Sequence, residues 1–222
     1  MATAAGNHAL AAVAMHGLGA WSLQRQRPRD ARLRFEAALA SALQAADPRL
    51  EASCLRDLGD AWRAAHEYAR ALERYAEAIT IACDLGDRTL AAHVERNRGA
   101  VLVETGRTED GIAAYSMALA HAAATGDLRL QQNLLSYVGR AQTSLGRHQQ
   151  AVTTHRRALA LARQSADKRA EGHRLGNIGD AFAAWGRVAE AREMYRQAVR
   201  IAQEVDDVAG EKLWSERLKR LG

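Results

Sequence analysis

The chain is poor in the residues that break helices or build disulfide frameworks. Its 222 residues include only 2 prolines and 2 cysteines, and aromatic residues make up 5% of the total. Two cysteines, Cys54 and Cys83, are too few for a disulfide scaffold and have no zinc-ligand spacing. We therefore expect two reduced thiols in a cytoplasmic protein, with a bond between them as the alternative. The remaining composition, rich in Ala, Leu, Arg and Glu, is typical of an all-α protein.

Long apolar runs and catalytic motifs are also missing. No stretch of 18 apolar residues occurs, so we expect no membrane-spanning helix. The Ala-rich N-terminus lacks the basic region of a signal peptide and contains His8 and His16. No P-loop, HExxH motif or paired-carboxylate spacing is present, which predicts no cofactor, no metal and no enzymatic activity. The 31 basic and 26 acidic residues are interleaved along the chain, which argues against nucleic acid as the partner.

What the sequence does contain is an internal repeat with a period of about 40 residues. A glycine column keeps this spacing through Gly19, Gly59, Gly99, Gly139 and Gly179. A ring-bearing column keeps it through Phe35, Tyr75, Tyr115, His155 and Tyr195, where His155 is interpreted as a core substitution. A third column holds side chains that can cap a helix N-terminus, namely Asn7, Asp47, Asp87, Asp127, Asp167 and Asp207.

A second break lies near the middle of each period, for example at Gly106 and Gly146, and divides it into two helices of about 16 residues. One such hairpin cannot bury its apolar face alone, so neighbouring hairpins must stack. The sequence therefore predicts one all-α domain over residues 1–222, an α-solenoid of five antiparallel hairpins with a C-terminal capping helix. The expected repeats cover approximately residues 7–46, 47–86, 87–126, 127–166 and 167–206, and the capping helix covers residues 208–221.

The repeat positions carry a family resemblance. Two repeats hold the same pattern of large and small residues, Leu55-x2-Leu58-Gly59-x2-Trp62 with Ala71-x3-Tyr75 and Ala78, and Leu175-x2-Ile178-Gly179-x2-Phe182 with Ala191-x3-Tyr195 and Ala198. This pattern resembles the tetratricopeptide repeat. The long period is similar to that of the extended subtype found in kinesin light chain and in the C-terminal arrays of bacterial regulators. The resemblance covers nearly the whole chain and implies a surface that docks a protein partner.

The resemblance also implies that the first helix of each hairpin lines a concave groove. Polar columns that vary between repeats on these helices are the candidate partner-binding positions: Arg56, Asp60, His93, Arg96, Asn97, Asn133, Tyr137, Arg140, His173 and Asn177. Arginines there can bind carboxylates bidentately, and asparagines can hold a peptide backbone. We therefore expect a peptide or protein partner with an acidic or carboxylate-bearing segment, bound by a basic stripe of Arg56, Arg96 and Arg140. The alternative is a solvated face in which arginines pair with carboxylates, namely Asp57, Asp60, Glu104 and Asp180.

Three functional hypotheses are compatible with this pattern. The first is a non-catalytic adaptor that binds a peptide or protein segment in its groove. The second is the ligand- or peptide-sensing component of a bacterial regulatory system. The third, which no motif supports, is an enzyme that uses the groove as a pocket. The pattern leaves the oligomeric state open.

Overall fold

A computed structural model describes the backbone of residues 2–222 and the side chains of residues 7–222. Over this range the chain is all helix and contains no strand, and none of its helices is long and apolar enough to cross a bilayer. The elements follow in the order α1 (Ala2–Gln24), α2 (Pro28–Ala45), α3 (Pro48–Ala64), α4 (Tyr68–Asp84), α5 (Arg88–Glu104), α6 (Thr108–Ala124), α7 (Leu128–Ser144), α8 (His148–Gln164), α9 (Lys168–Ala184), α10 (Val188–Glu204) and α11 (Val208–Lys219).

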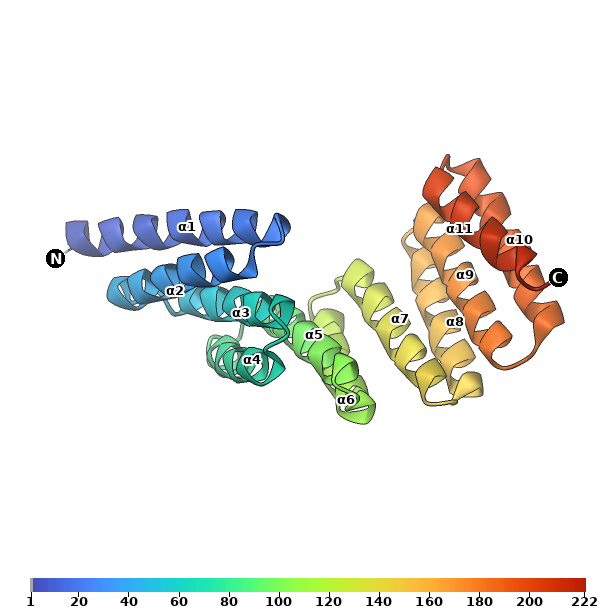
Figure 1. Ribbon diagram of the computed structural model, residues 1–222, viewed down its shortest axis with the longest axis horizontal. Coiled ribbons are helices and arrows are strands. Elements are labelled where there is room, and N and C mark those ends of the chain that lie inside the picture. The colour runs from blue at the N-terminus through green and yellow to red at the C-terminus, as the bar shows by residue number, and fades with distance from the viewer. Residues whose placement is uncertain (1) are drawn as a thin grey trace. The chain divides into compact units, whose positions relative to one another are not determined.

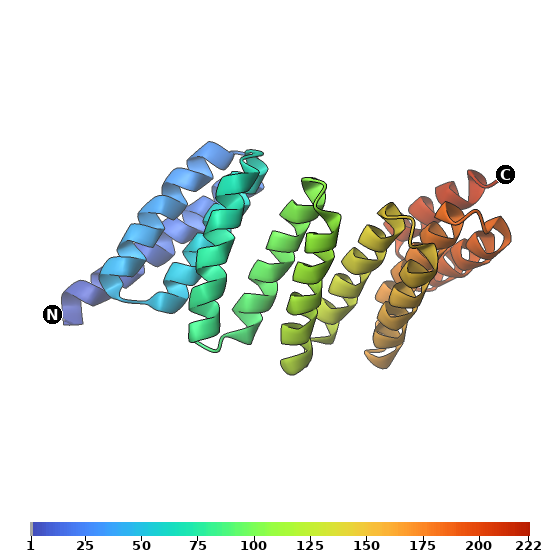
Figure 2. The ribbon, with the colours of Figure 1, turned by 90° about the horizontal axis from the view of Figure 1, so that it is seen from below.

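Consecutive helices pair as antiparallel hairpins, α1 with α2, α3 with α4, α5 with α6, α7 with α8 and α9 with α10, and α11 packs on the last pair (Figures 1 and 2). This confirms the predicted α-solenoid of five hairpins and a terminal helix. The chain divides into two compact units, Met1–His121 and Ala122–Gly222, which are described here one at a time. That the repeats form a single domain stays a prediction.

Aspartates begin the first helix of each of the four later hairpins and the terminal helix α11. Each carboxylate accepts a hydrogen bond from the backbone N–H three residues later, at 2.9–3.2 Å, as expected of an N-cap. The residues concerned are Asp47, Asp87, Asp127, Asp167 and Asp207. Asn7 was expected to cap the first helix, and this was wrong: α1 begins at Ala2 and Asn7 lies exposed within it. The Ala-rich segment before Asn7 favours the helical state, so the helix continues through it.

The residues of the glycine column pack against those of the ring column. Every glycine of the column lies against the ring of the second helix of its own hairpin, and an added Cβ would come within 2.5–2.7 Å of that ring. His155 takes this ring position in the fourth hairpin, next to Gly139, and is 1% exposed, which confirms it as a core residue. Burial, with the nearby Arg174 and Arg140, lowers the pKa of His155 to about 4, so its ring is neutral at pH 7.

The two cysteines are both free thiols. Cys54 is fully buried in α3, whereas Cys83 is exposed near the end of α4. Burial raises the pKa of the Cys54 thiol to about 12, and neighbouring carboxylates add to the shift. Cys54 therefore acts as a small apolar core residue.

Unit Met1–His121 contains one charged pair at core positions. Glu95 and Arg98 of α5 occupy columns that hold Leu55 and Leu58 in the preceding repeat. Glu95 is fully buried, and neither of its carboxylate oxygens has a hydrogen-bond donor among the described residues. Arg98 Nε lies 3.3 Å from Glu95 Oε2, within ion-pair distance but not aligned for a hydrogen bond. Burial raises the pKa of Glu95, and the nearby charge of Arg98 offsets this rise only in part. The ionised carboxylate therefore lowers the stability of the folded state.

Replacing Glu95 with glutamine is expected to raise the thermal midpoint at pH 7. An acid whose pKa is raised on folding binds more protons when folded, so its contribution to stability falls as the pH rises above the unfolded value of about 4.3. The gain should be about 1 kcal/mol at pH 7 and should vanish below pH ~4, where the carboxyl is protonated in both states. Midpoints measured between pH 3.5 and pH 8 by circular dichroism test this. A gain that is equal at every pH would contradict it.

Candidate partner-binding site

Five of the predicted site residues lie on α3 and α5 of unit Met1–His121, where they are tied into contacts within the protein. Asp60 accepts a hydrogen bond from Tyr75 Oη at 2.5 Å and two from Asn97 Nδ2 at 2.8 and 3.0 Å. Asn97, 6% exposed, accepts in turn from Arg96 at 2.9 and 3.1 Å. Burial raises the pKa of Asp60, an effect that the hydrogen bond from Tyr75 reduces. This network joins two hairpins and holds the Tyr75 ring in the core.

The remaining residues of this set are also close to partners. Arg56 Nε donates to Asp57 Oδ1 at 2.7 Å, and Asp57 Oδ2 lies 2.6 Å from His16 Nε2. Burial acts to raise the pKa of Asp57, but the hydrogen bonds from His16 and Arg56 lower it. His93 is half-buried on α5. Glu104, expected to face one of the stripe arginines, pairs bidentately with Arg63. In this unit Arg56 is thus paired with a carboxylate, as the solvated-face alternative expects.

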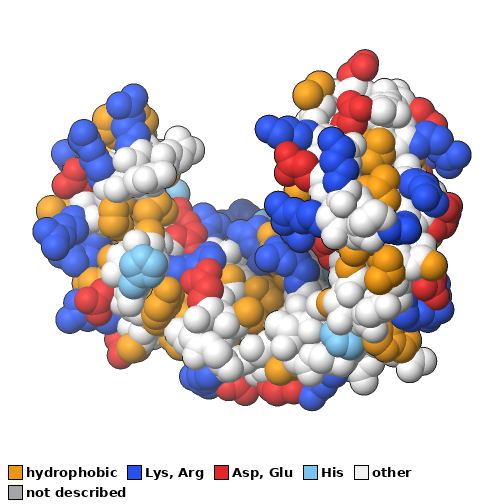
Figure 3. Space-filling model, turned by 45° about the vertical axis from the view of Figure 1, so that its right-hand side comes forward, with side chains coloured by type: hydrophobic (Ala, Val, Ile, Leu, Met, Phe, Trp, Pro, Cys, Tyr) orange, Lys and Arg blue, Asp and Glu red, His pale blue; other side chains and the backbone are white. Residues whose placement is uncertain are grey.

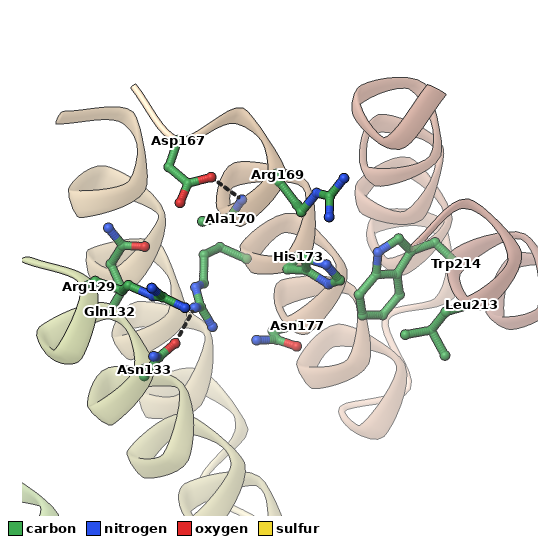
Figure 4. A pocket seen from close by; sticks show the side chains of 11 residues that line it. Arg129, Gln132, Asn133, Asp167, Arg169, Ala170, His173, Asn177, Leu213 and Trp214 are labelled. Carbon is green, nitrogen blue, oxygen red and sulfur yellow. Dashed lines mark hydrogen bonds between the residues drawn. The ribbon is translucent and has the colours of Figure 1, made fainter. Parts of the chain in front are cut away.

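Unit Ala122–Gly222 contains a pocket of about 410 Å³ between α7, α9 and α11. Figure 4 shows α7 on one side, with Arg129, Gln132 and Asn133, and α11 on the other, with Leu213 and Trp214. Helix α9 and its N-cap Asp167 form the floor, where Figure 4 shows Arg169, His173 and Asn177. Arg174 of the same helix also lines the pocket. The pocket therefore joins a polar floor to an apolar wall.

Arg174 is the most unusual residue of this pocket. Its guanidinium donates to Ser136 Oγ at 2.5 Å and to Asn133 Oδ1 at 2.8 Å, the latter being the dashed bond that ends on Asn133 in Figure 4. The side chain is half-buried, its Nε is buried without an acceptor, and it forms no ion pair with any described residue. Burial lowers the pKa of the guanidinium, which nevertheless remains cationic at neutral pH. A fixed positive charge thus lines the pocket without an ion-pair partner, although the nearby Tyr137 and Asp167 partly offset the effect of burial on its pKa.

The carboxylate of the pocket forms no ion pair with Arg174. Asp167, the N-cap of α9, accepts from Ala170 N at 2.9 Å, and its charge acts on Arg174 only from a distance, where it favours the guanidinium cation. His173 Nε2 lies 3.0 Å from Asp207 Oδ2, and two further arginines, Arg129 and Arg169, are exposed at the rim. The unit as a whole has 17 basic and 11 acidic residues, and Lys and Arg are prominent on its visible face at the right of Figure 3. The pocket is therefore suited to an anionic group.

The structure brings three of the predicted residues together here, Asn133, His173 and Asn177. Asn177 also lines a second pocket of about 450 Å³ with Arg140, Asp180 and Arg217. Arg140 is exposed and forms no ion pair with the residues that are described, whereas Asp180 accepts from Tyr195 Oη at 2.8 Å. Tyr137 is exposed on α7 and lines neither pocket.

Arg174 was missed by the sequence prediction, although the repeat contains a signal for it. Its column holds Ala14, Cys54, Val94 and Leu134 in the other repeats, so Arg174 is a charged residue in an apolar column. The prediction considered only columns that were polar and variable. Gly176, two residues later, breaks its column in another way, because it is a glycine where the other repeats hold polar side chains, and it leaves the space that the indole of Trp214 fills.

The described residues contain no group of three His, Cys, Asp or Glu side chains that could hold a metal ion.

Comparisons with known structures agree on the fold. A kinesin light chain-type protein of Podosopora anserina with nearly identical TPR-like repeats has a TM-score of 0.74 at 16% identity, over 86% of this chain and 95% of that one. A signal transduction ATPase from Pyrococcus horikoshii with a tetratricopeptide repeat sensor has a TM-score of 0.81 at 13% identity, over 91% of this chain and 31% of that one. A Rap protein complexed with competence and sporulation factor has a TM-score of 0.66 at 12% identity, over 93% and 62%.

Among curated proteins, none has a sequence that matches this chain. The family model of the tetratricopeptide repeat, in contrast, matches twice, over residues 89–164 and 130–204. Together these matches span residues 89–204, more than half of the 222 residues. The chain therefore belongs to the tetratricopeptide repeat family.

Proposed function

We propose that this protein is a non-catalytic interaction module that binds an acidic or carboxylate-bearing segment of a peptide or protein in the pocket of unit Ala122–Gly222. Arg174 carries the proposal, because it is a half-buried cation, fixed by two hydrogen bonds and without a carboxylate partner in the described chain. A ligand carboxylate would supply the missing counter-charge through a charge-assisted hydrogen bond.

The rest of the pocket favours a peptide over a bare anion. The amide groups of Asn133 and Asn177 can donate to and accept from a peptide backbone. Leu213, 40% exposed, offers an apolar surface beside the charge, and Trp214, which is buried, also lines the pocket. We therefore expect a segment in which an acidic residue or a free C-terminus lies next to an apolar side chain.

A sensing role in a bacterial regulatory system is the second candidate. It is supported by the likeness to the repeat sensor of the Pyrococcus horikoshii ATPase and to the Rap protein complex, whose folds this chain shares. In that case the same pocket would bind the signal, and a separate effector would respond to it.

A phage-displayed library of random 12-residue peptides provides the test. We expect selection on the wild-type chain to enrich peptides that contain Asp or Glu beside an apolar residue. The Arg174→Leu variant should lose this enrichment, and for a synthesised selected peptide the dissociation constant should rise at least 30-fold, because the buried ion pair can no longer form. Fluorescence anisotropy of the labelled peptide measures the constant.

Arg156→Leu is the matched control, since Arg156 is exposed on α8 and lies outside the pocket. It removes the same charge and should leave binding within about 2-fold at 0.15 M salt. If the wild type and Arg174→Leu select the same peptides with equal affinity, the pocket is not the binding site and the proposal fails.

A further inference from the structure

Helix α1 exposes a continuous apolar stripe. Residues at the spacing of one helix face, Leu10, Val13, Ala14, Gly17, Leu18 and Trp21, are all exposed. The large members are 45–72% exposed, which is unusual for six neighbouring apolar positions on one helix. The opposite face of α1 packs on α2, with Ala12 and Gly19 buried there.

In later repeats the positions of Ala14, Leu18 and Trp21 are mostly buried, whereas those of Val13 and Gly17 hold polar residues that are mainly half-buried. Leu58 and Ala61 of α3, which correspond to Leu18 and Trp21, pack in one cluster with Ala31 and Phe35 of α2. Ile178 and Ala181 of α9 pack in the same way with residues of α8. The edge of the stripe that contains Leu18 and Trp21 therefore corresponds to a repeat-packing surface, and no other part of the described chain covers the stripe.

The absence of charged residues from α1 restricts which partner could cover this surface. Residues 2–24 contain no Asp, Glu, Lys or Arg, and every other helix of the chain contains at least one. A charged partner helix would have to bury its charges against an apolar face without compensation, at considerable cost. The surface thus selects a partner that is itself an uncharged, apolar helix.

We infer that the stripe of α1 pairs with the stripe of α1 in a second copy of this chain. The chain itself supplies the required partner, and a twofold contact between identical surfaces is the most common way in which copies associate. The other end of the chain is a poor match, because α11 presents exposed charges, Lys212, Glu216, Arg217 and Lys219. Pairing of α1 with α1 is therefore favoured over head-to-tail stacking.

An antiparallel pair of α1 helices fits the size and charge of the stripe. With the twofold axis near Ala14, Leu10 of each copy meets Leu18 of the other, and the small residues Ala14 and Gly17 allow close approach. Arg25, which lies over the Trp21 ring at 4.6 Å, would be about 16 Å from the axis, so the two Arg25 side chains lie well beyond the Debye length from each other. A single helix per copy gives a small interface, so we expect a dissociation constant of about 10 µM.

Charge variants at Gly17 test the inference, because no described atom lies within 4 Å of the place where its Cβ would be and a side chain there leaves the monomer undisturbed. Sedimentation velocity at 1–100 µM should show the wild-type mass rise from 24.2 kDa towards twice that value. Gly17→Glu and Gly17→Lys should each remain largely monomeric at 100 µM, which corresponds to a rise of the dissociation constant by about 100-fold or more. An equimolar mixture of the two should recover the dimer, because the opposite charges then lie near each other on either side of the twofold axis.

Ala37→Glu is the control, since Ala37 is exposed on α2 and the variant adds the same charge outside the stripe. It should dimerise like the wild type, and all variants should keep wild-type helicity. A wild type that stays monomeric at 100 µM would overturn the inference. So would a Gly17→Glu variant that still dimerises, or a mixture of the two charge variants that fails to recover the dimer.

Discussion

Replacing Gly139 with leucine is expected to lower the thermal midpoint by roughly 6–12 °C, which corresponds to about 3 kcal/mol of unfolding free energy in a chain of this size. A Cβ at Gly139 would lie 2.5 Å from two atoms of the His155 ring, and Leu adds three further carbons at that point. His155 is 1% exposed and has no room to move away without disturbing the core of the hairpin. The two helices α7 and α8 would therefore have to separate.

Gly17→Leu is the matched control for this variant. Gly17 is also a helical glycine, but the space around its Cβ position is open. Because leucine has the higher helix propensity, this variant should gain about 0.5 kcal/mol when measured at 1 µM. Thermal unfolding followed by circular dichroism compares the two. Equal midpoints for Gly139→Leu and the wild type would show that the close packing of the glycine and ring columns does not limit stability.

The sequence was sufficient to predict the fold because its local signals agree with the repeat. The aspartate caps, the glycine column and the ring column each recur once in every period, and each fixes one feature of the hairpin. The exception at Asn7 has a physical cause, since a cap residue begins a helix only when the preceding segment does not itself favour helix. The presence of the first helix was therefore predictable, whereas its N-terminal boundary depended on the residues that precede Asn7.

The candidate site was less predictable, because the hydrogen-bond partners of its side chains lie on other helices. Asp60 was expected to face a partner, but it accepts from Tyr75, which is 15 residues away, and from Asn97, which is 37 residues away. Whether a polar side chain is free or bonded depends on which neighbour the fold places beside it. Arg174 illustrates the opposite case, since a residue in an apolar column meets two acceptors but no carboxylate in the described chain. A residue that breaks its column is thus a second kind of site candidate, beside the variable polar columns that supply Asn133, His173 and Asn177 to the same pocket.

Arg174→Leu is expected to raise the unfolding free energy by about 1–3 kcal/mol while it removes ligand binding. Leucine is the residue of the same column at Leu134, which is fully buried, so the position accepts an apolar side chain of this size. The wild-type guanidinium is desolvated, its Nε lacks an acceptor, and no ion pair with a described residue compensates its charge. A residue that lowers stability in this way is typical of a functional site, where the ligand supplies the missing interaction.

Chemical denaturation of the ligand-free protein at pH 7 measures this gain, with Arg156→Leu as the exposed control, which should change the unfolding free energy by less than about 0.5 kcal/mol. For the wild type alone, a saturating selected peptide should add stability, because it binds the folded state only. A loss of stability in Arg174→Leu would mean that the bonds to Ser136 and Asn133 outweigh the cost of burial. Arg174 would then be a structural link between α7 and α9, and its charge would no longer indicate a carboxylate ligand.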